Sequence, residues 1–286
     1  MKWFEVKERS AGEKRLVLTY FCYKCLGKFS VEIIAFFVAL VTFFKAKDLR
    51  RCSEKYLAIV GVKPSFINVF KHFLSYAMSL ADKIEVFAGG FDMKKIRPDS
   101  GAQKFLESKS SEKGAVCIFS HIGNIDIARA LIDKNRKITI VLSLEQAKIF
   151  REFLKKLSFQ KNITLCPVED MGIETAFLLK EKLENGENVF IAGDRTSKNA
   201  KNIDVEILNR RAEFPLGTFK LAELAEVPVY FVSCLKSKKF YDFEVREFQV
   251  FEKCAVKMAQ RFADFVSEQI QKAPFQFYHF YDFFKE

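Results

Sequence analysis

The pattern of hydrophobic and polar positions divides the chain into two parts. In residues 46–87, apolar side chains recur three and four residues apart, a spacing that predicts helices. From residue 114 onward, short apolar runs alternate with amphipathic segments, which predicts strands alternating with helices. Residues 88–113 hold a Gly-Gly pair, a proline and a polar run, and are predicted to connect the two parts. This order predicts an α/β fold, with a central, mostly parallel sheet flanked by helices and a later antiparallel edge.

Each expected element can be assigned to a range. Strands are expected at residues 115–120, 137–142, 163–166, 189–192, 205–208, 228–235 and 240–251. Helices are expected at residues 125–133, 144–157, 172–184, 215–225 and 255–271, followed by an aromatic tail at 274–284. Within residues 46–87, Pro64 is expected to open the second of two helices, because proline is favoured at the first helical position.

An apolar stretch before residue 46 predicts contact with a membrane. Residues 31–44, VEIIAFFVALVTFF, would form a helix about 21 Å long, short of the roughly 30 Å hydrocarbon core of a bilayer. This length, with Glu32 inside it, favours an interfacial or re-entrant helix; a full span and a buried core helix are the alternatives. The flanking bases, which would face an anionic cytoplasmic leaflet, are Lys24, Lys28, Lys45, Lys47, Arg50 and Arg51.

Composition and charge narrow the class of protein. The chain has 286 residues, 49% hydrophobic and 29% charged, which excludes a disordered or fibrous protein. The formal net charge is +11, and residues 1–60 carry +6 of it. These bases surround an apolar helix, and the sequence has no nucleic-acid motif, so we expect no nucleic acid as a partner. We expect residues 1–62 to form a membrane-associating helical region and residues 63–286 an α/β domain.

The candidate chemistry centres on His121, which follows the first predicted strand. Sites in open α/β sheets form at the carboxyl ends of strands. Gly123 gives the turn backbone freedom, and Asn124 is expected to cap the next helix. Asp126, in the first helical turn, is expected to bond one imidazole nitrogen and leave the other as a general base. Ser120 is not expected to be a nucleophile, because neighbouring side chains on a strand point apart.

A second group of candidates follows the fourth predicted strand. Asp194 and Arg195 begin a polar loop there, at the sheet edge that also holds His121. The Arg195 guanidinium is expected to hold a phosphate or sugar of the acceptor, or the oxyanion; a surface ion pair with Asp194 or Glu213 is the alternative. Gln146 is expected to touch the acceptor, unless it is an ordinary helix residue.

The remaining histidines and cysteines predict no metal site. His72 lies in a predicted helix and His279 in an aromatic run, and both are expected to be structural. Cys22 and Cys25 form a C-x-x-C pair, but no second pair stands at a zinc-site spacing. The seven cysteines are scattered and odd in number, and no secretory signal is expected, which indicates a reduced, cytosol-facing protein.

Residues 121–126, HIGNID, form an H-x4-D motif, and with it the chain resembles the lysophospholipid acyltransferase superfamily. The branch that it resembles is that of the bacterial lipid A late (lauroyl and myristoyl) acyltransferases. Stretches that follow in the family's order are 185–197 (NGENVFIAGDRTS), 208–211, 214–217 (FPLG), 227–229 (VPV) and 275–284. Residues 192–194 are Ala-Gly-Asp where the phospholipid branch has Pro-Glu-Gly, which argues against a simple glycerol-phosphate acyltransferase.

The resemblance implies a glycerolipid acyltransferase-like fold and an enzyme on the cytoplasmic face of a bacterial inner membrane. It implies transfer of a fatty acyl chain from acyl carrier protein or coenzyme A to a hydroxyl or amine of a lipid or glycolipid acceptor. No metal is required, and no cofactor beyond the thioester donor. A thioesterase or lipase-type hydrolase and a non-catalytic membrane-binding module are the alternatives. The implied residues are His121 and Asp126 for catalysis, and Gly123, Asn124, Gln146, Asp194 and Arg195 for substrate binding.

Overall fold

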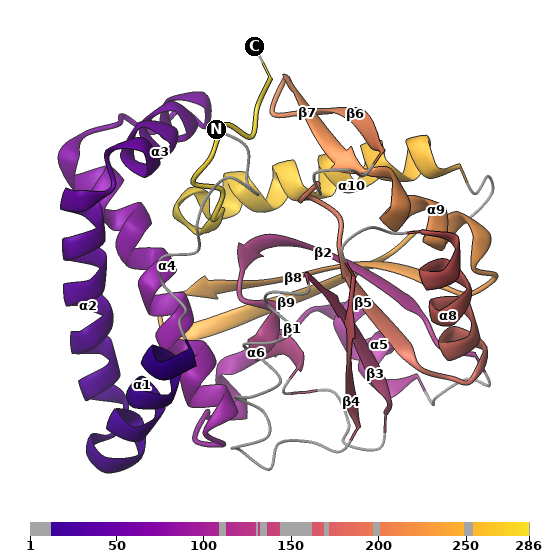
Figure 1. Ribbon diagram of the computed structural model, residues 1–286, viewed down its shortest axis with the longest axis horizontal. Helices are drawn as coiled ribbons and strands as arrows, with labels where there is room; N and C mark the ends of the chain where they lie inside the picture. Colours follow the sequence, from indigo (N-terminus) through magenta and orange to yellow (C-terminus); the bar gives the residue numbers. More distant parts are fainter. Residues whose placement is uncertain are drawn as a thin grey trace.

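A seven-stranded sheet forms the centre of the molecule (Figure 1). The computed structural model describes residues 13–108, 113–129, 131, 136–143, 162–168, 172–196, 201–248 and 254–285. The strand order of the sheet is β1-β9-β8-β2-β5-β3-β4. In it β8 and β9 pair antiparallel, and every other pair of neighbours is parallel. The predicted α/β fold with a mostly parallel sheet is confirmed.

The strands of the sheet span Ile96–Pro98 (β1), Val116–Gly123 (β2), Ile138–Leu142 (β3), Ile163–Pro167 (β4), Asn188–Ala192 (β5), Val229–Ser237 (β8) and Phe240–Glu247 (β9). Asn202–Ile207 (β6) and Arg210–Pro215 (β7) form a separate antiparallel hairpin. The α-helices span Glu13–Leu26 (α1), Lys28–Lys45 (α2), Lys47–Ile59 (α3), Phe66–Phe87 (α4), Ser100–Glu107 (α5), Ile125–Arg129 (α6), Ile173–Glu184 (α8), Leu216–Leu224 (α9) and Ala255–Lys272 (α10). Short 3-10 turns lie at Met93–Lys95 and Pro274–Gln276.

β2 lies in the middle of the sheet and is buried on both faces. Successive side chains of a strand point to opposite faces. Ile118 accordingly belongs to the hydrophobic core that contains Phe262 of α10, and Cys117 to the core that contains Phe105 of α5. A continuous apolar run of this kind is typical of a strand covered by helices on both sides. Because β2 is fixed in this way, the residues at its carboxyl end are held in a defined place.

The predicted connection at residues 88–113 is wrong in part, because it contains β1 and α5. β1 pairs with β9 at the sheet edge, and three residues are too few for a period-two pattern to show. β7 is also additional to the predicted strands; it pairs with β6 across a turn at Leu208 and Asn209, whose φ angles of 54° and 57° suit a tight hairpin. The helix predicted at residues 125–133 is seen as Ile125–Arg129, and the helix predicted at 144–157 lies outside the described residues.

Side-chain caps set where α4 and α5 begin. The Asp99 carboxylate accepts a hydrogen bond from the backbone N–H of Ala102 at 2.6 Å, which satisfies one of the free donors in the first turn of α5. The Ser65 hydroxyl accepts from the N–H of Asn68 at 3.3 Å and caps α4 in the same way. Pro64 therefore precedes this helix by two positions and does not open it.

The N-terminal helices α1, α2 and α3 pack beside α4 at one end of the molecule (Figure 1). α2 packs on α4 through a stripe with one residue per turn, which consists of Val31, Ala35, Ala39 and Phe43. Among the described helices, none is by itself long and apolar enough to cross a bilayer; α2 and α3 together, bent by 96°, meet that requirement by length and composition. The domain division at residue 62 stays a prediction.

The aromatic tail after α10 is held against α4 by His72. His72 is buried; its Nε2 donates to the carbonyl of Phe277 at 2.9 Å, and its Nδ1 lies 2.9 Å from the Ser53 hydroxyl, which donates to it. The ring also stacks on Phe280, with centroids 4.5 Å apart. Burial lowers the pKa of His72 to about 4, so the ring is neutral at physiological pH.

We expect His72→Phe to keep the stacking and remove both hydrogen bonds. Leaving the Phe277 carbonyl and the Ser53 hydroxyl without this partner should lower the free energy of unfolding by about 1–3 kcal/mol. An unfolded histidine takes up a proton near pH 6.5, and the buried one only near pH 4, so wild-type stability falls as pH drops between these values. The variant should lose stability less steeply over that range. Denaturant melts at several pH values measure both effects, and equal slopes for the two proteins would contradict the assignment.

Candidate active site

His121 lies near the carboxyl end of β2, where the strand departs from regular pairing. The register between β2 and β8 shifts just before Gly123. Gly123 has a φ of 64°, and a Cβ there would lie 2.1 Å from the carbonyl oxygen of Cys234, so this turn requires glycine. The His121 side chain emerges here with 25% of its surface exposed. This imidazole is therefore accessible at the surface of the turn.

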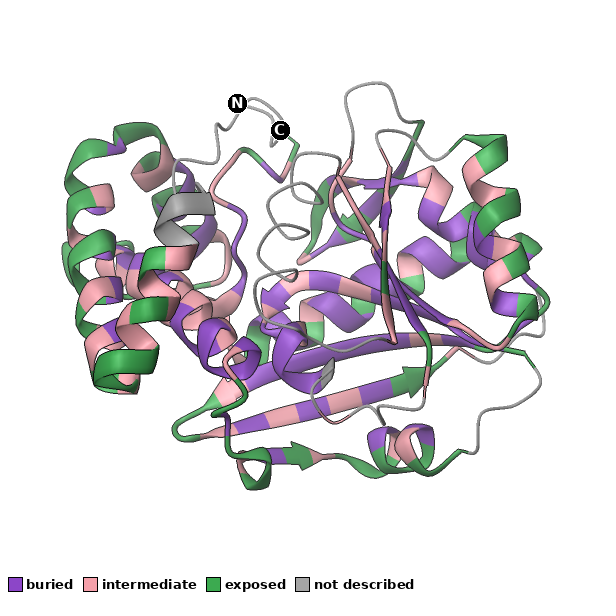
Figure 2. Ribbon diagram, turned by 60° about the horizontal axis from the view of Figure 1, so that its bottom comes forward, coloured by how far each residue is buried: buried purple, intermediate pink, exposed green. Residues whose placement is uncertain are grey.

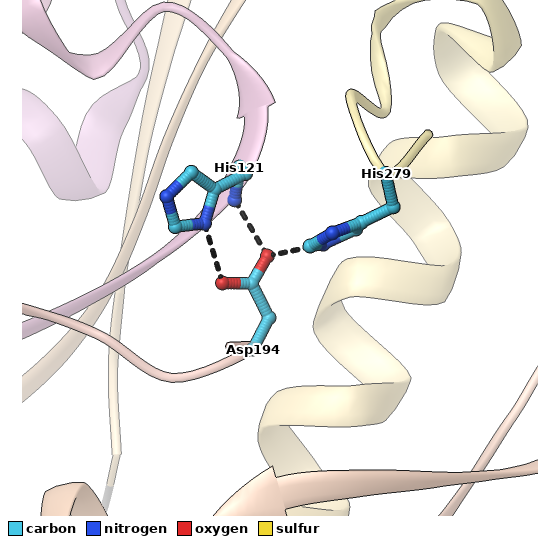
Figure 3. Close-up of side chains that lie close together, drawn as sticks. All are labelled: His121, Asp194 and His279. Atoms are coloured by element: carbon cyan, nitrogen blue, oxygen red, sulfur yellow. Dashed lines mark hydrogen bonds and ion pairs between the residues drawn. The ribbon is translucent and has the colours of Figure 1, made fainter. Parts of the chain in front are cut away.

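The carboxylate of Asp194 lies directly against this imidazole (Figure 3). Its Oδ1 accepts a hydrogen bond from Nδ1 of His121 at 2.8 Å, and its Oδ2 accepts from the backbone N–H of His121 at 2.6 Å. Nε2 of His279, in the C-terminal tail, donates to the same Oδ2 at 2.8 Å. Asp194 can approach β2 so closely because Gly193 precedes it: a Cβ at that position would lie 2.7 Å from side chains of β2 and α10.

Burial and hydrogen bonding define the charge of this group. Burial by itself would raise the pKa of the Asp194 carboxyl, but the two imidazoles and their hydrogen bonds hold this pKa well below its usual range. Burial lowers the pKa of His279 to about 4, so His279 is neutral at physiological pH. A carboxylate can only accept, so both histidines present protonated nitrogens to it. When the His121 ring is neutral, its proton is on Nδ1 and its free lone pair is on Nε2. A general base needs such a lone pair to accept a proton.

Asp126, the expected partner of the imidazole, contacts α4, and its predicted bond to His121 stays a prediction. Its Oδ2 forms an ion pair of 2.6 Å with Nζ of Lys83 on α4. The imidazole Nδ1 is bonded to Asp194, because the parallel pairing of β2 with β5 places the two strand ends side by side. Asp194, expected to bind substrate, has no exposed side-chain surface and contacts the His121 imidazole. Its predicted contact with a substrate stays a prediction.

Of the other residues expected to bind substrate, Asn124 and Arg195 each donate a hydrogen bond to a backbone carbonyl of the protein. Asn124, expected to cap α6, uses its amide Nδ2 to donate to the carbonyl of Ser79 on α4 at 2.8 Å. Arg195 is half-buried, and its Nη2 donates to the carbonyl of Tyr278 at 3.3 Å. Its predicted contact with a substrate stays a prediction. Gln146 lies outside the described residues.

His279 is a site residue that the sequence pattern does not single out, since it stands in an aromatic run expected to be structural. A histidine among phenylalanines in the C-terminal tail is the one signal that could have drawn attention to it. Ser120 is buried, and within the described part of the chain its hydroxyl has no hydrogen-bonding partner that could activate it as a nucleophile.

The two histidines and the aspartate are also residue types that bind transition metals. Their ligand atoms lie within 4.8 Å of one another, which makes them the candidate metal-binding group of the described residues. The hydrogen bonds of 2.8 Å from each ring to Asp194 account for this closeness without an ion.

A family model for bacterial lipid A biosynthesis acyltransferases matches residues 66–286, well over half of the chain. The chain therefore belongs to this family, and the resemblance carried by the H-x4-D motif is confirmed. No curated protein matches the chain. Membership makes the protein an acyltransferase of lipid biosynthesis, and the matched region contains His121, Asp194 and His279.

We expect Asp194→Asn to lower kcat by about 10²–10⁴-fold with little change in KM. The amide cannot hold the imidazole in the required tautomer or stabilise its charged form. Asp126→Asn should cost less, because it weakens an ion pair with Lys83 and leaves the bond to Nδ1 in place. Steady-state kinetics of both purified variants, with thermal melts as the control for folding, compare the two carboxylates. A larger loss for Asp126→Asn would show that the motif carboxylate orients the base.

Proposed function

We propose that this family member transfers a fatty acyl chain from an acyl thioester to a hydroxyl or amine of a lipid or glycolipid acceptor. The donor is a thioester of acyl carrier protein or coenzyme A. The observation that carries the proposal is the 2.8 Å hydrogen bond between Nδ1 of His121 and the buried Asp194 carboxylate. It is the arrangement that makes an imidazole a general base.

The reaction follows from this pair. The acceptor gives its proton to Nε2 of His121 as its oxygen or nitrogen attacks the thioester carbonyl carbon. Asp194 stabilises the imidazolium that forms. The carbon–sulfur bond then breaks, and the imidazolium returns the proton to the leaving sulfur, which gives an ester or amide and a free thiol. These reaction steps require no covalent enzyme intermediate, which agrees with the burial of Ser120.

Arg195 is our candidate for holding the acceptor. It follows Asp194 directly, at the same sheet edge as His121, and the Tyr278 carbonyl holds one of its nitrogens. A guanidinium can hold a phosphate or sugar through two parallel hydrogen bonds, and we assign this role to Arg195. The family match supports a lipid acceptor in general terms.

We also propose that the N-terminal helices bind the cytoplasmic face of the inner membrane. α2 is apolar around its circumference, and its stripe against α4 covers only one face (Figure 2). The apolar side chains that α1, α2 and the start of α4 leave exposed are Leu18, Phe21, Leu26, Phe29, Ile33, Phe36, Phe37, Val38, Val41, Phe44, Phe66 and Ile67. Apolar side chains exposed in this number on neighbouring helices fit the interface of a bilayer.

The bases around this surface divide into two groups. Lys28 forms ion pairs with Glu85 at 2.7 Å and with Asp82 at 3.2 Å, so its charge is already compensated inside the protein. Lys45 and Lys47 are exposed beside the bend between α2 and α3. They are the better candidates for contact with anionic head groups.

His121→Ala tests the proposed activity, and we expect it to lower transfer by about 10²–10⁴-fold while the protein stays folded. Mass spectrometry of the lipid products, with and without acceptor, is the measurement. Wild type should produce acylated acceptor, and free fatty acid should stay a minor product. Free fatty acid at the same rate whether or not acceptor is present would instead identify a hydrolase. Full transfer by His121→Ala would exclude the base.

Binding to vesicles tests the membrane surface. Phe37→Asp with Val41→Asp should weaken binding to phosphatidylglycerol-containing vesicles by at least about tenfold, because each apolar side chain contributes ~1.5–3 kcal/mol when buried and 1.4 kcal/mol is tenfold. The matched control is Ile173→Asp with Phe177→Asp, which replaces apolar side chains on α8 that are at least as exposed. This control should bind like wild type. Equal losses for both pairs, or no binding by wild type, would exclude the assigned surface.

A further inference from the structure

Three consecutive residues of the C-terminal tail are each bonded to a different part of the protein. The carbonyl of Phe277 accepts from His72 at 2.9 Å. The backbone N–H of Tyr278 donates to the carbonyl of His121 at 3.0 Å, beside an antiparallel bridge between Phe277 and Ile122. The ring of His279 then reaches Asp194. The tail thus runs alongside the turn at His121–Gly123, and the imidazole of His279 contacts Asp194 there.

The surroundings of His279 are almost entirely aromatic. Its side chain is 1% exposed; it stacks on Phe283 with centroids 4.5 Å apart and meets Phe277 and Tyr281 edge-on at 4.2 and 5.0 Å. A phenylalanine would suit this environment at least as well. Indeed, Nδ1 of His279 is buried and has no hydrogen-bonding partner among the described residues, which costs about 1–3 kcal/mol. Packing therefore does not explain a histidine here, and the Nε2–H donor is what it adds.

That donor completes the coordination of Asp194. With His279 present, Oδ2 receives two hydrogen bonds and Oδ1 receives the imidazole of His121. Without it, the carboxylate keeps its two hydrogen bonds to His121 and loses its hydrogen bond to the C-terminal tail. Because His279 is neutral, it stabilises the carboxylate through one hydrogen bond and adds no full positive charge beside it. Most of the negative charge of Asp194 therefore stays available for the imidazolium that forms on His121.

We propose that His279 is a positioning residue for catalysis: through Asp194 it holds the His121 imidazole in the orientation that presents Nε2 to the acceptor. The inference rests on the proposed role of His121 as general base. It makes the docked C-terminal tail part of the active site, although the tail need not touch substrate.

Two variants separate the hydrogen bond from the packing. His279→Phe keeps an aromatic ring between Phe277, Tyr281 and Phe283 and removes the hydrogen-bond donor. His279→Gln removes the ring and keeps an amide N–H at about the reach of Nε2. We expect His279→Phe to lower kcat roughly tenfold to a hundredfold, as the loss of a supporting partner usually does, with KM unchanged. His279→Gln should recover most of kcat even if it melts at a lower temperature.

The pH dependence of kcat is a second readout, one that a loss of folded protein would not move. Removing a donor from Asp194 leaves its negative charge less compensated, which favours the charged imidazole. The acidic limb of the profile should therefore move to higher pH in His279→Phe and stay near wild type in His279→Gln. The control is His72→Phe, which loosens the same tail without touching Asp194 and should leave the profile unchanged.

Several results would overturn this role. One is wild-type kcat and pH profile in folded His279→Phe; another is equal loss of kcat in the Phe and Gln variants at equal stability. Inactivation of wild type by EDTA that Zn²⁺ reverses would mean that the three side chains hold a metal instead. His121→Ala, measured in the same assay, distinguishes a failure of the His279 role from a failure of the proposed function. If it is inactive while His279→Phe is fully active, only the role of His279 fails; if it is active, the proposed function itself fails.

Discussion

A carboxylate with no exposed surface is the constraint on which the site depends. Removing the charge of Asp194 from water is costly unless several donors satisfy it. The donors come from two places far away in sequence, 73 and 85 positions distant. β5 must lie beside β2, and the tail must lie across the turn, before the charge is satisfied. The same three hydrogen bonds therefore serve both the proposed chemistry and the tertiary structure.

Local pattern was enough to predict much of the architecture. The alternation of strands and helices after residue 114, the mostly parallel sheet and the position of His121 at a strand end all follow from short-range periodicity and are confirmed. The family resemblance came from motifs that lie within the matched region. The periodicity did not predict two strands. β1 has only three residues, and β7 depends on a hairpin turn with positive φ angles.

The partner of the imidazole could not be predicted in the same way. Asp126 is close to His121 in sequence and is an obvious candidate, whereas Asp194 becomes a neighbour only through the pairing of β2 with β5. Its signal in the sequence was a small residue followed by an acid at a strand end, which predicted the correct edge of the sheet but not the contact. His279 had even less signal, because its partner lies in another segment and its neighbours are all apolar.

The docked tail has a consequence for the population of active molecules. Segments of a folded protein open and close locally with free energies below that of global unfolding. Each opening of residues 277–279 would separate His279 from Asp194 without disturbing the central sheet. The observed turnover number would then be the intrinsic rate multiplied by the fraction of molecules whose tail is closed. Temperature or detergent could lower activity by shifting that fraction while the core of the protein remains fully folded.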